Sequence, residues 1–240
     1  MLSIKPYNSR VKVFANFLLF GLLASAAHAQ TIGYSPLGAV VSPGKPIRVS
    51  KEIGALLPSH AIVRMMKETH LNKAGETSLV YDMKPEFEPY SHIAIIRDGK
   101  RVADFRLASV FPLSVGAEGY ALVQAAEFKL PVGDDAFVTA FENIGDGAGT
   151  LFVVISNWQG NYRVSWKKGT TQGRFQVLQS GKVRVWNGLD DSECVWCEEH
   201  YTIETLEWQD GAFARLQKVT PGHKYSPYSI HNPAIVFEKP

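Results

Sequence analysis

The stretch IAIIRDGKRVADF, residues 93–105, carries the clearest fold signal in this chain of 240 residues. Two apolar-rich segments, 93–97 and 101–105, flank the dipeptide Asp98-Gly99. Both residues of such a dipeptide tolerate the positive φ values that a two-residue hairpin turn requires. The stretch therefore predicts two antiparallel strands joined by a tight turn.

Further strand candidates lie on both sides of this hairpin. Segment 78–83 (SLVYDM) is typical of a strand and ends before Pro85. Turn-forming residues separate the later candidates, which are 119–128, 136–142, 150–156, 161–166, 174–178, 182–187, 200–208 and 212–218. Because no helical pattern comes between them, they predict antiparallel sheets rather than strand–helix–strand units. We expect a mainly β fold of antiparallel sheets, propeller-like or sandwich-like, with one short N-terminal helix.

The expected helix lies at residues 59–71 (SHAIVRMMKETHL), where Ser59 is a suitable N-cap. The apolar side chains that fall roughly on one helical face are Ile62, Met65, Met66 and Leu71. The helix belongs to an irregular lead-in, residues 30–77, which precedes a β domain at 78–220.

The last segment, residues 221–240, combines prolines with aromatic and aliphatic residues. Its prolines are Pro221, Pro227, Pro233 and Pro240. A disordered tail rarely carries so many aromatic residues. We expect an extended strap that places apolar side chains on the β domain.

The first 29 residues have the three-part layout of a secretory signal peptide. A basic head with Lys5, Arg10 and Lys12 precedes an apolar run at 13–24, and Ala27-His28-Ala29 forms a cleavage motif. The apolar run is shorter than the roughly 20 residues that a membrane-spanning helix needs. We therefore expect cleavage before Gln30, a periplasmic or secreted location, and no transmembrane segment after cleavage.

Removal of this segment changes the charge balance. The chain has 25 basic and 23 acidic residues, and loss of the three basic ones leaves a net charge of about −1 with histidine neutral. Nucleic-acid binding needs a clustered basic surface. We therefore expect no nucleic-acid partner.

Two stretches in the second half of the chain resemble each other. Trp166 precedes Phe175 across a glycine-containing turn, and Trp208 precedes Phe213 in the same way. The Trp residues are 42 positions apart and the Phe residues 38. A period near 40 suits the blade of a β-propeller. Each unit is expected to be two strands joined by a turn.

Residues 142–154 (ENIGDGAGTLFVV) resemble the loop-and-strand signature of FG-GAP and VCBS-type bacterial β-propeller repeats. The resemblance covers residues 136–218 and implies a calcium-binding loop, in which Glu142 matches the first acid and Asp146 the central one. Ile144 and Thr150 stand where the family has further ligands. Calcium takes six to eight oxygen ligands. We therefore expect a structural turn without metal, with calcium as an alternative.

The two cysteines, Cys194 and Cys197, allow several interpretations. In an exported protein a local disulfide is expected. A redox pair is disfavoured because acidic residues flank the motif. A zinc site needs four ligands. Here Cys194, Cys197 and His200 provide three, with Asp191 or Glu199 as a fourth. Attached haem is excluded, because Glu198 stands where that motif has histidine.

No familiar nucleophile, zinc-protease or phosphate-binding motif occurs in the chain. Carboxylates near residues 134–146, including Asp134, Asp135 and Glu142, leave open a cell-envelope enzyme that hydrolyses glycans. The second alternative is a thiol or metal protein centred on the cysteine pair. We assign no catalytic residue.

Aromatic residues are the stronger functional lead, since they often anchor partners on a rigid scaffold. Trp158 and Trp196 lie in turn-rich stretches, which favours an exposed position for both. We expect a non-catalytic binding module for an extracytoplasmic protein or a glycan, without a resident cofactor.

Overall fold

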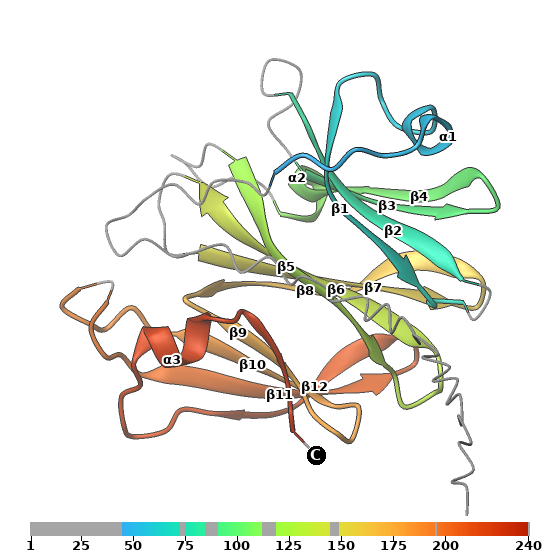
Figure 1. The fold of residues 1–240 in the computed structure, drawn as a ribbon. Coiled ribbons are helices and arrows are strands. Elements are labelled where there is room, and N and C mark those ends of the chain that lie inside the picture. Colours follow the sequence, from blue (N-terminus) through green and yellow to red (C-terminus); the bar gives the residue numbers. More distant parts are fainter. Residues whose placement is uncertain are drawn as a thin grey trace, which may run out of the picture.

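The computed structural model describes residues 45–72, 75–84, 91–111, 119–144, 149–194 and 196–239. The predicted signal peptide and the Gly145–Gly147 turn lie outside these ranges. Within them, the strands form three sheets that are stacked in layers (Figure 1). The mainly β, antiparallel fold predicted from the sequence is thereby confirmed. No sheet of the described ranges closes into a barrel.

The first two sheets are four-stranded meanders, in which each strand pairs with the next one along the chain. The first sheet consists of β1 (Ala61–Thr69), β2 (Glu76–Met83), β3 (Ser91–Arg97) and β4 (Lys100–Arg106). The second sheet consists of β5 (Gly119–Lys129), β6 (Asp135–Ile144), β7 (Gly149–Trp158) and β8 (Asn161–Thr171).

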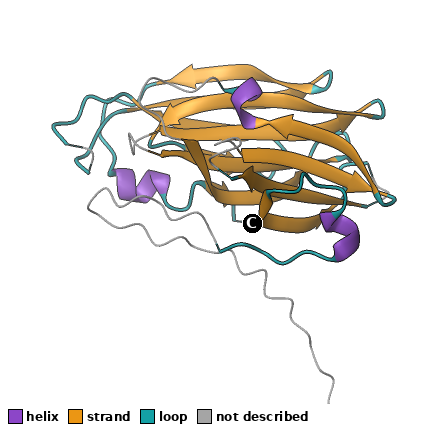
Figure 2. Cartoon of the chain, turned by 90° about the horizontal axis from the view of Figure 1, so that it is seen from above, coloured by secondary structure: helices purple, strands orange, loops and turns teal. Residues whose placement is uncertain are grey.

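The third sheet has the spatial order β12-β11-β10-β9-β13. Its strands are β9 (Arg174–Val177), β10 (Val183–Gly188), β11 (Tyr201–Gln209), β12 (Ala212–Val219) and β13 (Ile235–Phe237). Strand β13 runs parallel to β9, so the C-terminal strap adds a strand to this sheet. The three helices within the described residues are short (Figure 2), namely α1 (Lys51–Gly54), α2 (Leu107–Val110) and α3 (Pro227–His231). Across the described ranges, no helix has the length and apolar character needed to cross a membrane.

The hairpin at residues 93–105 forms as predicted, between β3 and β4. Asp98 and Gly99 have φ values of 52° and 67°, the positive values that a tight turn of this type requires. The later strand candidates also appear as β5 to β12, with ends shifted by a few residues.

The helix predicted at residues 59–71 is wrong, because residues 61–69 form strand β1. Strand β1 pairs with β2 from Ala61 opposite Met83 to Thr69 opposite Glu76. The helical periodicity was short, and this ladder outweighs it, as tertiary pairing commonly outweighs local propensity. The one short N-terminal helix is instead α1, where the Ser50 side chain accepts a hydrogen bond from the backbone N–H of Ile53.

The second sheet is buried on both faces, and its two central strands are apolar in both directions. Phe137 and Ile155 pack against the first sheet, in a cluster that includes Ile93 and Ile95. Val138 and Phe152 pack against the third sheet, in a cluster that includes Phe175. All four side chains of the second sheet have no exposed surface. Continuous apolar runs in β6 and β7 therefore follow from a sheet without a solvent face.

The two similar stretches around Trp166 and Trp208 do not form equivalent hairpins. Trp208 and Phe213 face each other in the β11–β12 hairpin of the third sheet. Trp166 lies in β8 of the second sheet, whereas Phe175 lies in β9 of the third. The expectation that each stretch is one hairpin is therefore wrong for the first. The family resemblance remains a prediction.

The passage from β8 to β9 depends on Gly173. A Cβ atom at this position would lie 2.0 Å from Thr170 Oγ1 and 2.7 Å from the Trp186 backbone oxygen. Both contacts are far shorter than van der Waals distance, so only glycine allows the chain to cross between the sheets here.

We predict that Gly173→Ala lowers the free energy of unfolding by about 1–3 kcal/mol, the usual cost of overpacking. Urea denaturation followed by circular dichroism measures this change. Gly222→Ala is the matched control, because a Cβ there meets no atom within 4 Å. Equal stability of Gly173→Ala and the wild type would contradict the assignment.

Candidate functional site

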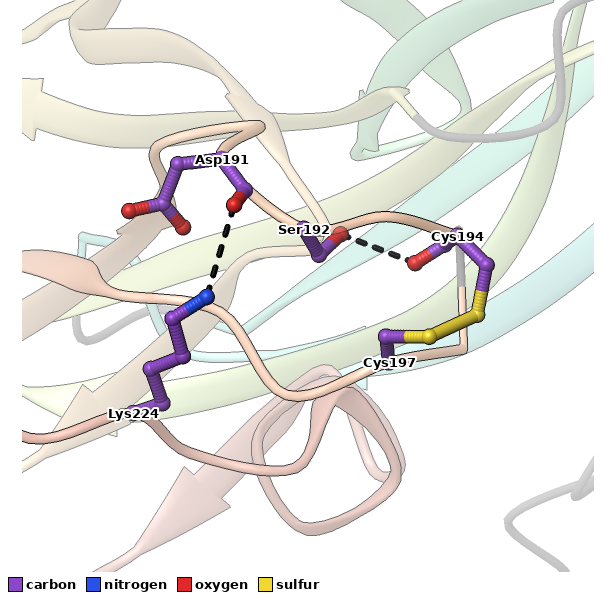
Figure 3. Close-up of a disulfide and its surroundings, with 5 residues drawn as sticks. All are labelled: Asp191, Ser192, Cys194, Cys197 and Lys224. Carbon is purple, nitrogen blue, oxygen red and sulfur yellow. Dashed lines mark hydrogen bonds between the residues drawn. A yellow bond between two sulfur atoms is a disulfide. The ribbon is translucent and has the colours of Figure 1, made fainter.

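A disulfide joins Cys194 and Cys197, with the two Cα atoms 5.1 Å apart. It closes a small loop between β10 and β11 (Figure 3). The Ser192 hydroxyl donates to the Cys194 backbone oxygen at 2.8 Å, and Lys224 Nζ donates to the Asp191 backbone oxygen at 3.4 Å. The disulfide therefore stiffens a loop that the C-terminal strap also contacts.

This arrangement bears on the other interpretations of the cysteine pair. Because the two sulfur atoms are bonded to each other, neither is available as a thiolate ligand for zinc. His200 is held by Asp191, whose Oδ2 lies 2.6 Å from His200 Nδ1. Hydrogen bonds from the His200 backbone N–H and side chain lower the pKa of the Asp191 carboxyl. The cysteine pair leads into strand β11 rather than into a helix, so it lacks the helix N-terminus that activates redox thiols.

Trp196, inside the disulfide loop, stacks on Tyr228 of α3. The two rings are nearly parallel, at 18°, with centroids 6.1 Å apart. Tyr228 is 52% exposed, and Trp196 is partly exposed. We call this pair the aromatic platform. The disulfide loop supplies one half of it and the C-terminal strap the other.

A second aromatic group lies behind the platform, on the outer face of the third sheet. The ring of Tyr225 makes edge contacts with Trp186, at 5.3 Å, and with Tyr201, at 6.1 Å. Two backbone hydrogen bonds between Tyr225 and Glu199 attach the strap to the strand-entry segment of β11. The strap thus covers this end of the sheet.

Four buried polar atoms lie on this face, and among them the Tyr201 hydroxyl and the Glu199 carboxylate interact with each other. They are Arg174 Nε, Trp186 Nε1, Glu199 Oε1 and Tyr201 Oη, which we call the polar row. Arg174 and Trp186 are direct ladder partners, and the rings of Trp186 and Tyr201 lie 6.3 Å apart. An unsatisfied buried polar atom costs about 1–3 kcal/mol. Arg174 Nε and Trp186 Nε1 are the two members of the row without a hydrogen-bond partner among the described residues.

Glu199 is the most informative member of the polar row, because its side chain is almost fully buried. Gly188 makes room for it, since a Cβ there would lie 2.4 Å from Glu199 Oε1. Its other oxygen accepts the Asp190 N–H at 2.9 Å. Burial raises the pKa of the Glu199 carboxyl, and the charges of Asp190 and Asp191 act in the same direction.

The same buried environment shifts the pKa values of two neighbours of Glu199. Burial raises the pKa of the Tyr201 hydroxyl, and the charge of Glu199 adds to this effect. Burial also lowers the pKa of Arg174. Sequence reasoning named Glu199 only as an alternative zinc ligand, placed Tyr201 in a crowded aromatic stretch without assigning it a role, and did not single out Arg174 or Tyr228. The aromatic content of the strap was the one signal that pointed to this face.

Trp158, the other aromatic candidate, lies in a different cluster from Trp196. It packs edge-on against Trp208 at 6.1 Å, and the Arg163 guanidinium lies over its ring at 5.8 Å. A Cβ at Gly211 would lie 2.7 Å from its ring. Trp158 is therefore a rim residue of the core between the second and third sheets.

Glu142 lies far from Asp134 and Asp135, the other carboxylates proposed for glycan hydrolysis. Asp135 and Glu142 lie near opposite ends of β6, seven residues apart. An extended strand rises about 3.3 Å per residue, which separates them by about 23 Å. This distance exceeds the ~6.5–9.5 Å of an inverting pair. The two residues do not form a catalytic pair.

Glu142 is instead held by a histidine that sequence reasoning did not single out. His231 Nε2 lies 2.7 Å from Glu142 Oε1, and His231 Nδ1 lies 3.4 Å from Thr150 Oγ1. Thr150 is fully buried, so its hydroxyl is closed to an external substrate. The three residues connect the strap to the second sheet. Asp146 lies outside the described residues.

A separate cavity of about 430 Å³ lies between α1, the β1–β2 connection and the β3–β4 turn. Its lining carries the carboxylates of Glu52, Glu68, Glu76 and Asp98 and the guanidinium of Arg97. Tyr162 donates to Glu76 at 2.5 Å and accepts from Arg97 at 3.3 Å. Burial and the hydrogen bond to Glu76 raise the pKa of Tyr162 to about 12. These paired groups connect the first and second sheets, and the remaining acids make the cavity unsuitable for anions.

Comparison of the chain with protein-family models, curated proteins and solved structures finds no match.

We predict that replacing both Cys194 and Cys197 by Ser lowers the free energy of unfolding by about 2 kcal/mol, because the closed loop is very small. Urea denaturation of wild type and variant measures the change. Reduction of the wild type should have the same effect and should leave the variant unchanged. Loss of the fold in the variant would show that the disulfide does more than stiffen one loop.

We predict that Glu199→Gln gains stability relative to the wild type as the pH rises. The raised pKa of Glu199 means that ionisation disfavours the folded state, so wild-type stability falls above the usual carboxyl pKa. Urea denaturation at a series of pH values above and below this pKa measures the difference.

Glu207→Gln is the matched control for this experiment, because a hydrogen bond from Lys182 lowers the pKa of Glu207. Its pH dependence should have the opposite sign. A difference between wild type and Glu199→Gln that does not change with pH would contradict the prediction.

Proposed function

We propose that this protein is a non-catalytic binding module of the periplasm or cell exterior, and that it holds a glycan at the aromatic platform. The stack of Trp196 on Tyr228 carries the proposal. Flat aromatic faces that remain partly exposed bury the apolar faces of a ligand, and their rigidity keeps the entropy cost of binding low.

The polar row supports a ligand rich in hydroxyl groups. Three of its atoms, on Arg174, Trp186 and Tyr201, are donors, and Glu199 Oε1 is an acceptor. Each of these atoms is buried, so a sugar hydroxyl at the platform reaches them only through a bridging water, which both accepts and donates. The row adjoins the platform, because Arg174 Nη2 donates to the backbone oxygen of Ser229, the residue after Tyr228.

The disulfide and the expected signal peptide support a location in the periplasm or at the cell exterior. Disulfides persist in oxidising compartments outside the cytoplasm. The loop that the disulfide stiffens also carries Trp196, so the bond reduces the motion of the platform before a ligand arrives.

We predict that Trp196→Ala and Tyr228→Ala each weaken glycan binding at least tenfold. A glycan array with the purified protein identifies the ligand, and isothermal titration calorimetry then compares the variants. Phe237→Ala is the matched control, because Phe237 is a similarly exposed aromatic residue on the same sheet. The proposal fails if the array finds no glycan, or if Phe237→Ala weakens binding as much as the platform variants.

A further inference from the structure

A histidine and two carboxylates converge where the first and second sheets meet. His70 follows the last residue of β1, Glu127 lies in β5, and Asp135 begins β6. One potential ligand atom from each side chain lies within 4.8 Å of the other two. The three residues come from separate segments of the chain, so the fold alone brings them together.

The strand register explains this convergence. Glu127 pairs with Phe137, and Asp135 stands two residues before Phe137 on the same face of β6. Phe137 packs in the cluster between the first and second sheets. The two carboxylates are therefore diagonal neighbours on the face that meets the end of β1.

Two successive backbone N–H groups, those of His70 and Leu71, are hydrogen-bonded to carboxylates. The His70 N–H donates to Glu127 Oε1, and the Leu71 N–H donates to Glu76 Oε2 at 3.0 Å. The Leu71 side chain has no exposed surface. The hydrogen bond to Glu127 also orients that carboxylate, as supporting hydrogen bonds do for ligands in metal sites.

From this geometry we infer that His70, Glu127 and Asp135 form a zinc-binding site that links the first sheet to the second. One imidazole nitrogen and two carboxylate oxygens match the ligand preferences of zinc, and two carboxylates neutralise its charge. Calcium and magnesium favour sites built from oxygen ligands, and this site has only two carboxylates.

Small side-chain movements complete the coordination. Ligand atoms around a tetrahedral zinc ion lie about 3.4 Å apart, given bonds of about 2.1 Å. The His70 side chain is 53% exposed, with Nδ1 3.8 Å from Glu127 Oε1, whereas Glu127 is mostly buried. His70 therefore provides the movement that closes the site, and its exposure leaves a fourth position open to water. Lys129, the ladder partner of Asp135, is exposed and lies on the same face of the sheet.

The test is zinc titration of the full purified chain, free of any affinity tag, after dialysis against EDTA. The buffer contains no reductant, so that Cys194 and Cys197 remain a disulfide and contribute no thiolate. Isothermal titration calorimetry with zinc chloride should give one ion per chain. Magnesium and calcium chloride should give no comparable binding, and zinc should raise the melting temperature.

Variants assign the binding to this cluster. His70→Ala and Asp135→Asn should each weaken zinc affinity tenfold or more and abolish the rise in melting temperature. Both preserve the backbone hydrogen bond of His70, and circular dichroism without metal checks that they fold. His60→Ala is the matched control, because His60 is an exposed histidine just before β1. Binding that survives both cluster variants, that His60→Ala weakens equally, or that does not saturate at one ion per chain would overturn the inference.

Discussion

The burial of the second sheet on both faces is the constraint on which the rest of this structure depends. Strands β6 and β7 have no solvent side, so their side chains must be apolar in both directions. Each fully buried large side chain contributes about 1.5–3 kcal/mol through its transfer from water. The first sheet buries one face of the second sheet, and the third sheet buries the other. The opposite face of each outer sheet contacts other segments of the chain.

The placement of polar groups follows from this stacking of three sheets. Buried atoms such as Ser156 Oγ and Trp208 Nε1 have no hydrogen-bond partner within the described residues, whereas charged groups between the layers are paired, as in the contacts of Glu76 with Tyr162 and of Lys168 with Glu204. Their pairing reflects the high cost of an uncompensated charge in a core. The polar row lies on the outer face of the third sheet, under the strap and next to the partly exposed stack of Trp196 on Tyr228. For this reason the aromatic platform and the polar row are the features that we connect with ligand binding.

Sequence reasoning succeeded where the signal was local. The turn residues Asp98 and Gly99 and the alternation of strands and turns depend on neighbours in the chain, so these elements were predicted closely. The short apolar periodicity at 59–71 was misleading, because pairing with β2 decides the conformation of that segment. The similar stretches around Trp166 and Trp208 diverge because one of them crosses between two sheets.

The sequence by itself determined the strand content, the positions of most turns and the proximity of Cys194 to Cys197, since each depends on residues a few positions apart. Tertiary structure alone decided which distant side chains meet. Glu142 and His231 are in contact although they are 89 residues apart, and the His70 N–H is hydrogen-bonded to Glu127, which is 57 residues away in the sequence. Trp196 meets Tyr228 only because the strap returns along the third sheet. Such contacts depend on the stacking of layers, and no local pattern encodes them.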